Sequence, residues 1–239
     1  MCGIIGYVGA RDASPILISG LRRLEYRGYD SAGVAIVSGG RLHIVKDAGK
    51  IGQLAEQVSR SPLSGTTGIA HTRWATHGVP SRLNAHPHTD PDETVAVVHN
   101  GIIENFYTLK KRLAKDGAIF QTDTDTEVFA HLIARFYNNG TLEEAVQKTL
   151  REVTGAYGIA VVSTREPDKI VGARNGSPLV VGIGEGENFV ASDVSAILEH
   201  TRQMIYLKDR EMVVLRAGGT EITNLDNVHI ERKPEKVLW

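Results

Sequence analysis

The chain contains one cysteine, and it is the second residue, Cys2. A residue as small as cysteine after Met1 permits removal of that methionine, which would leave Cys2 with a free α-amino group. Such an amine has a pKa of about 7.7–8.0 and could accept the proton of the neighbouring thiol. Because the thiolate is the nucleophilic form, one residue would supply both nucleophile and base. The plainer alternative is a small buried apolar side chain.

Asn100 and Gly101 follow an apolar stretch and could complete an acyl-transfer site around such a nucleophile. A side-chain amide and a backbone N–H that point at the same place form an oxyanion hole. The same dipeptide is also typical of a type I′ hairpin turn, and taken alone the pair favours the turn.

Arg73, Trp74 and Asp125 are candidates for substrate binding. A guanidinium can hold a carboxylate through two parallel hydrogen bonds, which suits Arg73 to that role. The neighbours of Trp74 do not form a core pattern, so an exposed lid residue is expected. Asp125 lies between Thr124 and Glu127, which have the spacing of a helix capping box. The two roles are compatible, since a helix N-terminus keeps a carboxylate ionised and able to bind an α-ammonium group.

Residues 73–93 form a loop with three prolines and three histidines, and long loops of this kind are usually functional or disordered. His86-Pro-His88 resembles a metal-binding spacing, but no Asp or Glu stands at a matching helical spacing, so no metal site is predicted. The histidines, which include His71, His77 and His99, are interpreted as polar groups near an active site. Glycines 182, 184 and 186 have the wrong spacing for a phosphate loop and predict a turn between strands.

The elements that would position these residues are strands and helices, with the helices grouped rather than strictly alternating with the strands. Apolar β-branched stretches predict strands at 2–8, 32–38, 41–46, 67–72 and 94–99, and at 157–163, 169–174, 179–183, 189–192, 204–207 and 212–216. Apolar residues at helical spacing predict helices over 12–26, 51–60, 104–116, 126–137 and 142–152. The hairpin-type spacing of the last strands indicates antiparallel pairing and an α+β fold.

The composition narrows the class of protein. A formal net charge of −1 argues against nucleic acid as a partner, because phosphate binding needs clustered Lys and Arg. One cysteine excludes a disulfide within the chain and favours a reducing, cytoplasmic compartment. We also expect no signal peptide and no membrane-spanning segment.

Seven segments in fixed order resemble the glutaminase domains of the glutamine–fructose-6-phosphate aminotransferases, the glucosamine-6-phosphate synthases. They are Cys2-Gly-Ile-Ile-Gly6, Tyr26-Arg-Gly-Tyr-Asp-Ser-Ala-Gly33, His71-Thr-Arg-Trp-Ala-Thr-His-Gly78, Asn84-Ala-His-Pro-His88, His99-Asn-Gly-Ile-Ile-Glu-Asn105, Thr124-Asp-Thr-Glu127 and Gly155-Ala-Tyr157. The segment at 26–33 distinguishes this family from asparagine synthetases and phosphoribosyl-pyrophosphate amidotransferases.

The resemblance implies an N-terminal-nucleophile fold, a four-layer αββα sandwich with two mostly antiparallel sheets between helical layers. It implies hydrolysis of L-glutamine to glutamate and ammonia through a γ-glutamyl thioester, with no cofactor. The implied roles are Cys2 as nucleophile, Asn100 and Gly101 as oxyanion hole, Arg73 for the α-carboxylate and Asp125 for the α-ammonium. Thr76 and His77 would line the pocket, Trp74 would belong to the closing loop, and Arg27 and Gly28 would border the site.

In this family a sugar-phosphate isomerase half follows, and the full-length enzyme is expected to be homo-oligomeric. We therefore expect residues 1–232 to form the glutaminase domain and residues 233–239 to begin an interdomain linker. Two alternatives remain open at this stage, namely a glutaminase partner of another synthase and a silent domain that senses glutamine. A silent domain has no need of a nucleophile at Cys2, and the segment at 26–33 argues against another synthase.

Overall fold

A computed structural model describes residues 2–74 and 78–238. The helices are α1 (Ala13–Leu24), α2 (Ile51–Arg60), α3 (Phe106–Lys115), α4 (Glu127–Phe136) and α5 (Leu142–Glu152), with short 3₁₀ turns η1 (Glu25–Arg27) and η2 (Val194–Ala196). The strands are β1 (Gly3–Val8), β2 (Ser31–Ser38), β3 (Arg41–Ala48), β4 (Thr67–Arg73), β5 (His88–Thr89), β6 (Val95–Ile103), β7 (Gly155–Ser163), β8 (Ile170–Asn175), β9 (Val180–Ile183), β10 (Asn188–Ala191), β11 (Gln203–Tyr206), β12 (Glu211–Arg216), β13 (Gly219–Asn224) and β14 (Glu235–Lys236).

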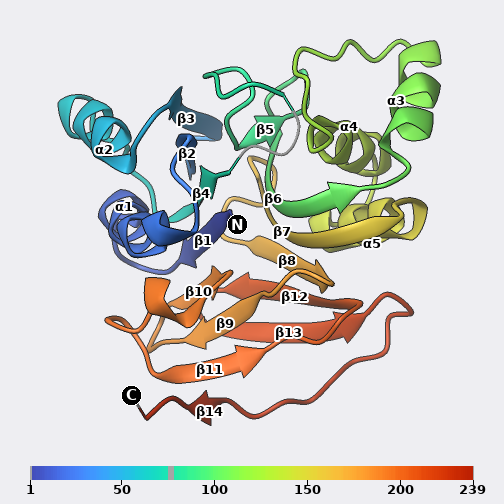
Figure 1. The fold of residues 1–239 in the computed structure, drawn as a ribbon. Helices are drawn as coiled ribbons and strands as arrows, with labels where there is room; N and C mark the ends of the chain where they lie inside the picture. The colour runs from blue at the N-terminus through green and yellow to red at the C-terminus, as the bar shows by residue number, and fades with distance from the viewer. Residues whose placement is uncertain (1, 75–77, 239) are drawn as a thin grey trace.

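Within the described residues, these strands form an eight-stranded sheet in the order β14-β11-β9-β10-β1-β4-β2-β3 and a six-stranded sheet in the order β13-β12-β8-β7-β6-β5. Neighbouring strands in both sheets are antiparallel. Helices α1 and α2 pack on the larger sheet, and α3, α4 and α5 gather on the other side of the molecule around the smaller one (Figure 1). A third apolar cluster lies between the two sheets. The α+β sandwich with two inner sheets and two outer helical layers is therefore confirmed.

Strand β1 carries the first candidate residue on a rigid support. It lies between β4 and β10 in the larger sheet, and all six of its residues are buried. Ile5 and Tyr7 face the cluster under α1, whereas Ile4 and Val8 face the cluster between the sheets. Both faces are covered by packed layers, which explains why the strand is a continuous apolar run rather than an alternating one.

The expected helices and strands are present, but two features differ from the sequence-based expectation. Strands β5, β13 and β14 were not predicted. Strand β6 continues through Asn100 and Gly101 to Ile103, because β7 pairs with it along this whole stretch. The interpretation of Asn100-Gly101 as a hairpin turn was therefore wrong. By contrast, the glycine turn between β9 and β10 is confirmed, with the Gly184 N–H donating to the Glu187 carbonyl at 2.9 Å.

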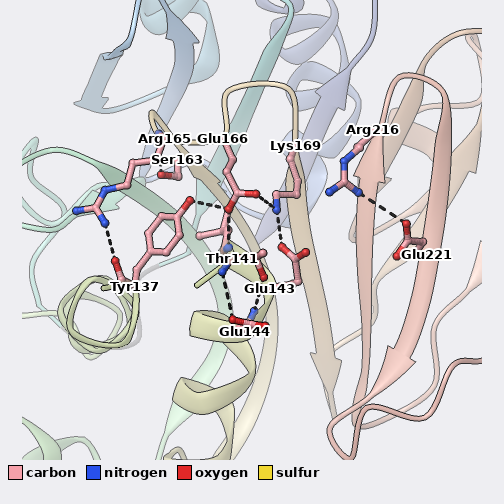
Figure 2. A network of polar contacts seen from close by, with 11 residues as sticks. Tyr137, Thr141, Glu143, Glu144, Ser163, Arg165, Glu166, Lys169, Arg216 and Glu221 are labelled. Carbon is pink, nitrogen blue, oxygen red and sulfur yellow. Dashed lines mark hydrogen bonds and ion pairs between the residues drawn. The ribbon is translucent and has the colours of Figure 1, made fainter. Parts of the chain in front are cut away.

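A buried lysine joins two helices to the turn between β7 and β8 (Figure 2). The side chain of Lys169 is only 1% exposed, and its ammonium group contacts the carboxylates of Glu143, at 2.5 Å, and of Glu166. Glu166 Oε1 in turn accepts hydrogen bonds from the Tyr137 hydroxyl and the Leu142 N–H, both at 2.6 Å. Because these groups come from the end of α4 and the start of α5, the network fixes the helical layer on the smaller sheet.

The C-terminal residues also pack on the larger sheet. Strand β14 pairs with β11, and Val237 is buried in the cluster beneath α1. No helix in the described part of the chain is both long and apolar enough to cross a lipid bilayer.

Candidate active site

Cys2 lies directly before β1, and its sulfur faces the end of β4. The Trp74 N–H donates to Cys2 Sγ at 3.2 Å, and Sγ is 3.5 Å from the Trp74 carbonyl oxygen. Burial raises the pKa of the Cys2 thiol, whereas the Trp74 N–H and the nearby charge of Arg73 lower it without cancelling the effect of burial. This half-buried thiol therefore needs a base close by before it can act as a nucleophile at neutral pH.

The side chain of Asn100 lies across from Cys2, and its orientation is defined by two contacts. Asn100 Nδ2 donates to the Cys2 carbonyl oxygen at 3.1 Å, and Asn100 Oδ1 is 2.9 Å from His71 Nε2. Burial lowers the pKa of His71 to about 3, so this imidazole is neutral and its Nε2–H can donate to Oδ1. An amide nitrogen carries two hydrogens, so Asn100 retains a second donor besides the one bound to Cys2.

Gly101 adopts a backbone conformation that other residues rarely reach, with φ of +134°. A Cβ atom at this position would lie 2.0 Å from the Ala156 carbonyl oxygen on the neighbouring strand. Gly101 is exposed at the mouth of the site although the strand around it is paired. The glycine is thus required for the local path of β6 beside Cys2.

Arg73 and Trp74 form another wall of the site, and Gly28 packs behind Trp74. The Arg73 side chain is buried at the end of β4, and its Nη2 donates to the Gly78 carbonyl at 3.3 Å. Trp74 is 52% exposed, as expected of a lid residue, and packs edge-on against Tyr29 with ring centroids 6.1 Å apart. A Cβ atom on Gly28 would lie 2.9 Å from Trp74 Cβ, so glycine allows this close approach.

Asp125 is buried opposite this wall, and its Oδ2 accepts a hydrogen bond from the Ile103 N–H at 2.8 Å. The capping box expected from Thr124 and Glu127 is absent, so that interpretation was wrong. The helix begins after Thr126, and Glu127 instead accepts hydrogen bonds from the backbone N–H groups of residues 121 and 122 at 2.8 Å. Asp125 is consequently fixed by the end of β6 rather than by its own helix.

The candidate residues line one pocket of about 410 Å³. Its lining is Cys2, Arg27, Arg73, Trp74, His86, His99, Asn100, Gly101, Ile102, Thr124, Asp125, Thr126, Ser177 and Pro178. The structure therefore brings six of the predicted residues other than Cys2 to the same cavity as Cys2. Gly28 packs against Trp74, which lines the cavity, whereas Thr76 and His77 lie outside the described residues.

Comparison with known proteins decides what kind of pocket this is. The model of the glutamine amidotransferase domain family matches residues 71–199, more than half of the chain. The chain belongs to this family. Among curated glutamine amidotransferases, the glutamine–fructose-6-phosphate aminotransferases (isomerizing) of Clostridium acetobutylicum and Thermus thermophilus are 50% and 52% identical over all of this chain. The chain spans 39% of the length of each of these relatives.

Solved structures agree with this family assignment. The glutamine phosphoribosylpyrophosphate amidotransferase of B. subtilis, determined with ADP and GMP, matches 94% of this chain and 49% of its own at 29% identity, with a TM-score of 0.82. A glutamine aminotransferase class-II domain protein of Silicibacter pomeroyi shares the fold, at 15% identity and a TM-score of 0.64. The N-terminal-nucleophile architecture of the amidotransferases is thus the fold of this chain.

Several residues of the amidotransferase pocket were not predicted from the sequence. Ser177 and Pro178 follow the Arg174-Asn-Gly segment at the end of β8, a turn signal that could have placed them at the same edge as Asn100. By contrast, His86 and His99 were interpreted as polar groups near an active site, and both do line the pocket, where burial lowers the pKa of each. In the described part of the chain, no three His, Cys, Asp or Glu side chains are grouped so that they could hold a metal ion.

Proposed function

We propose that this amidotransferase domain hydrolyses L-glutamine to glutamate and ammonia at Cys2. One observation carries the proposal: Cys2, Asn100 and Gly101 border the same cavity as the buried side chains of Arg73 and Asp125. A nucleophile, a pair of oxyanion donors and two opposite charges for an α-amino acid are the parts that glutamine hydrolysis needs.

The reaction begins with removal of Met1, which converts the Cys2 nitrogen from an amide into an amine. This amine takes the thiol proton, and Sγ attacks the side-chain carbonyl carbon of glutamine. The carbonyl oxygen becomes an oxyanion, which the free Nδ2 hydrogen of Asn100 and the N–H of Gly101 stabilise. The protonated amine then returns the proton to the leaving nitrogen, the C–N bond breaks, and ammonia departs to leave a γ-glutamyl thioester.

Water completes the cycle, since it attacks the thioester carbonyl while the amine again accepts a proton. The same oxyanion donors serve this second step, and collapse of the intermediate releases glutamate and restores the Cys2 thiol. The histidines near the pocket are poor candidates for the base, because burial lowers the pKa of His71, His86 and His99.

Glutamine would be held at its α-carbon by Arg73 on the carboxylate and Asp125 on the ammonium. Trp74 would cover the bound substrate, Arg27 and Gly28 would border it, and we propose Thr76 and His77 as further pocket residues. No metal or other cofactor is needed for this chemistry.

The relatives extend the proposal to a longer protein. We propose that residues 1–232 are the glutaminase domain and that residues 233–239 lead into a sugar-phosphate isomerase domain. In that full-length, homo-oligomeric cytoplasmic enzyme, the ammonia would convert fructose 6-phosphate to glucosamine 6-phosphate. The named relatives at 50–52% identity support this synthase over the phosphoribosyl-pyrophosphate amidotransferase, which is 29% identical.

The proposal is tested by glutamate release from L-glutamine, with Cys2→Ala as the matched variant. We expect turnover by the chain with Met1 removed and none by Cys2→Ala, which should keep the same circular dichroism spectrum. A glutamine analogue with an electrophilic side chain should add once to the intact mass of the chain and not to Cys2→Ala, because no other cysteine exists. Appreciable turnover by Cys2→Ala would refute the mechanism.

A further inference from the structure

A group of polar contacts at the Cys2 carbonyl has no role in the proposed reaction steps. Arg27 belongs to η1, and its Nε donates to the Cys2 carbonyl oxygen at 3.2 Å. The Arg27 side chain is only 8% exposed, and its Nη1 lies 3.2 Å from Asp193 Oδ2. The same carboxylate oxygen accepts a hydrogen bond from the Tyr26 hydroxyl at 3.0 Å.

The sheet register explains why Asp193 is beside the nucleophile although 191 positions separate them in sequence. Ile5 pairs with Ala191, and Ser192 continues the pairing by donating its N–H to the Ile4 carbonyl at 3.0 Å. The Ile4 N–H returns a hydrogen bond to Ser192 Oγ at 2.9 Å. Because the two strands are antiparallel, Asp193 continues along the residues that precede Ile4 and so lies near Cys2.

Asp193 is itself held in place. Its Oδ1 accepts the Ser195 N–H at 2.9 Å at the start of η2, which leaves Oδ2 for Arg27 and Tyr26. Burial alone would raise the pKa of Asp193, but the hydrogen bonds from Ser195 and Tyr26 and the charge of Arg27 lower it overall. The carboxylate is accordingly ionised at neutral pH and can fix a guanidinium group.

We propose that Asp193 is a positioning residue for the nucleophile, acting through Arg27 on the Cys2 carbonyl. That carbonyl has two side-chain donors, Arg27 Nε from η1 and Asn100 Nδ2 from β6. The carbonyl carbon is bonded to the Cα from which the side chain extends, so the two donors together set the direction in which Cβ and Sγ leave the backbone. The Asp193 carboxylate holds the Arg27 guanidinium in the position from which Nε reaches the Cys2 carbonyl. Without this carboxylate, the guanidinium would turn toward water or toward the substrate carboxylate.

This proposal rests on the proposed glutamine hydrolysis, and it predicts a loss in kcat rather than in KM. Substrate binding is assigned to Arg73 and Asp125, whereas the Asp193 carboxylate binds Ser195, Arg27 and Tyr26. A misplaced nucleophile, in contrast, slows the attack itself, and a displacement of about 1 Å can cost about 100-fold. We therefore expect Asp193→Asn to lower kcat about 10- to 100-fold and to leave KM for glutamine nearly unchanged.

Two variants separate this role from simple stabilisation of the turn at η2. Asp193→Ser keeps a side-chain oxygen that can accept the Ser195 N–H but cannot reach Arg27, so it should lose kcat as Asp193→Asn does. Glu199→Gln removes a more exposed ion pair, Arg23 with Glu199 at 2.6 Å, which joins α1 to the same segment without contacting Cys2. Glu199→Gln should retain the kcat of the parent chain.

The decisive comparison is a double-mutant cycle between Asp193→Asn and Arg27→Gln, measured on the chain with Met1 removed. If Asp193 acts through Arg27, the double variant will have the kcat of Arg27→Gln alone. Multiplied losses, an unchanged kcat in Asp193→Asn, or an equal loss in Glu199→Gln would each overturn the proposal.

A crystal structure of Asp193→Asn provides a readout that does not depend on turnover. We expect Arg27 Nε to have left the Cys2 carbonyl oxygen, and a contact retained near 3.2 Å would overturn the proposal. If the parent chain releases no glutamate, the proposed function fails, whereas the position of Arg27 in this structure still decides the role of Asp193.

Discussion

Replacement of Asn100 by alanine separates the catalytic contribution of its side chain from the structural one. The variant removes Nδ2, which donates to the Cys2 carbonyl and is assigned to the oxyanion. It also removes Oδ1, the partner of His71 Nε2 at 2.9 Å. The Cys2 carbonyl keeps the hydrogen bond from Arg27 Nε, so it is not left without a donor.

The two losses have different sizes and appear in different measurements. Loss of one oxyanion donor typically costs about 2.7–4 kcal/mol in the transition state, which is about 100- to 1000-fold in kcat. KM should change little, because the oxyanion exists only during the reaction and not in bound glutamine. His71 is fully buried, so its unpaired donor should lower the free energy of unfolding by about 1–3 kcal/mol.

Steady-state glutamate release and urea unfolding measure these two quantities on the same preparation. Asn100→Asp is the matched control, since it keeps an oxygen acceptor for His71 but has no donor for the oxyanion. It should lose at least as much kcat as Asn100→Ala. A rise in KM with kcat unchanged in Asn100→Ala would refute the assignment and make Asn100 a substrate contact.

The remaining predictions concern binding, the buried lysine and pH. Arg73→Lys should raise KM for glutamine by the equivalent of about 1.5–3 kcal/mol, since lysine cannot form two parallel hydrogen bonds; an unchanged KM in initial-rate assays would contradict this. Asp125→Asn should weaken binding of glutamine, measured by calorimetry, but not of an analogue without the α-amine, and equal losses would leave Asp125 a structural role only. Lys169→Met leaves two carboxylates facing each other without their cation and should lower the free energy of unfolding by about 3–5 kcal/mol with kcat unchanged, whereas a stability equal to the parent would contradict the network in Figure 2. Burial would raise the pKa of Glu127, but hydrogen bonds from His131 and the backbone lower it from 4.5 to about 2. The contribution of the ionised Glu127 carboxylate to the free energy of unfolding should therefore be complete above pH 4.5 and be lost as pH falls toward 2. The urea midpoints of Glu127→Gln and the parent should converge at low pH, and a constant difference would contradict this.

The helices, the strands and the α+β class were accessible from the sequence because they rest on local patterns, whereas the sandwich fold was implied by the family resemblance. Strand β1 is a continuous apolar run, and the helices follow apolar spacing of about 3.6 residues. Strand β13 was missed because Ile222 is its one buried residue, so the alternation that marks a strand is too weak. Cys2, Arg73 and Asp125 could be proposed because their chemistry is carried by single residue types.

The sequence could not show where contacts with distant segments override a local structural preference. Asn100-Gly101 has the local preference for a turn, but pairing of β6 with β7 overrides it. Glu127 has capping-box spacing, but the N–H groups of residues 121 and 122 bind its carboxylate instead. Asp193 carried no signal, because its relation to Arg27 and Cys2 depends on a strand register that the sequence does not reveal.

The proposed mechanism depends most directly on the free amine of Cys2. A retained Met1 would turn that amine into an amide, which cannot accept a proton at neutral pH, and would place an extra residue beside the thiol. The decisive measurement is kcat for glutamate release by two preparations, one with Met1 removed and one with removal blocked, each verified by intact mass. We predict turnover by the first and very slow turnover by the second, with Cys2 present and reduced in both. Comparable kcat values would contradict the assignment of the Cys2 amine as the base, and with it the N-terminal-nucleophile mechanism.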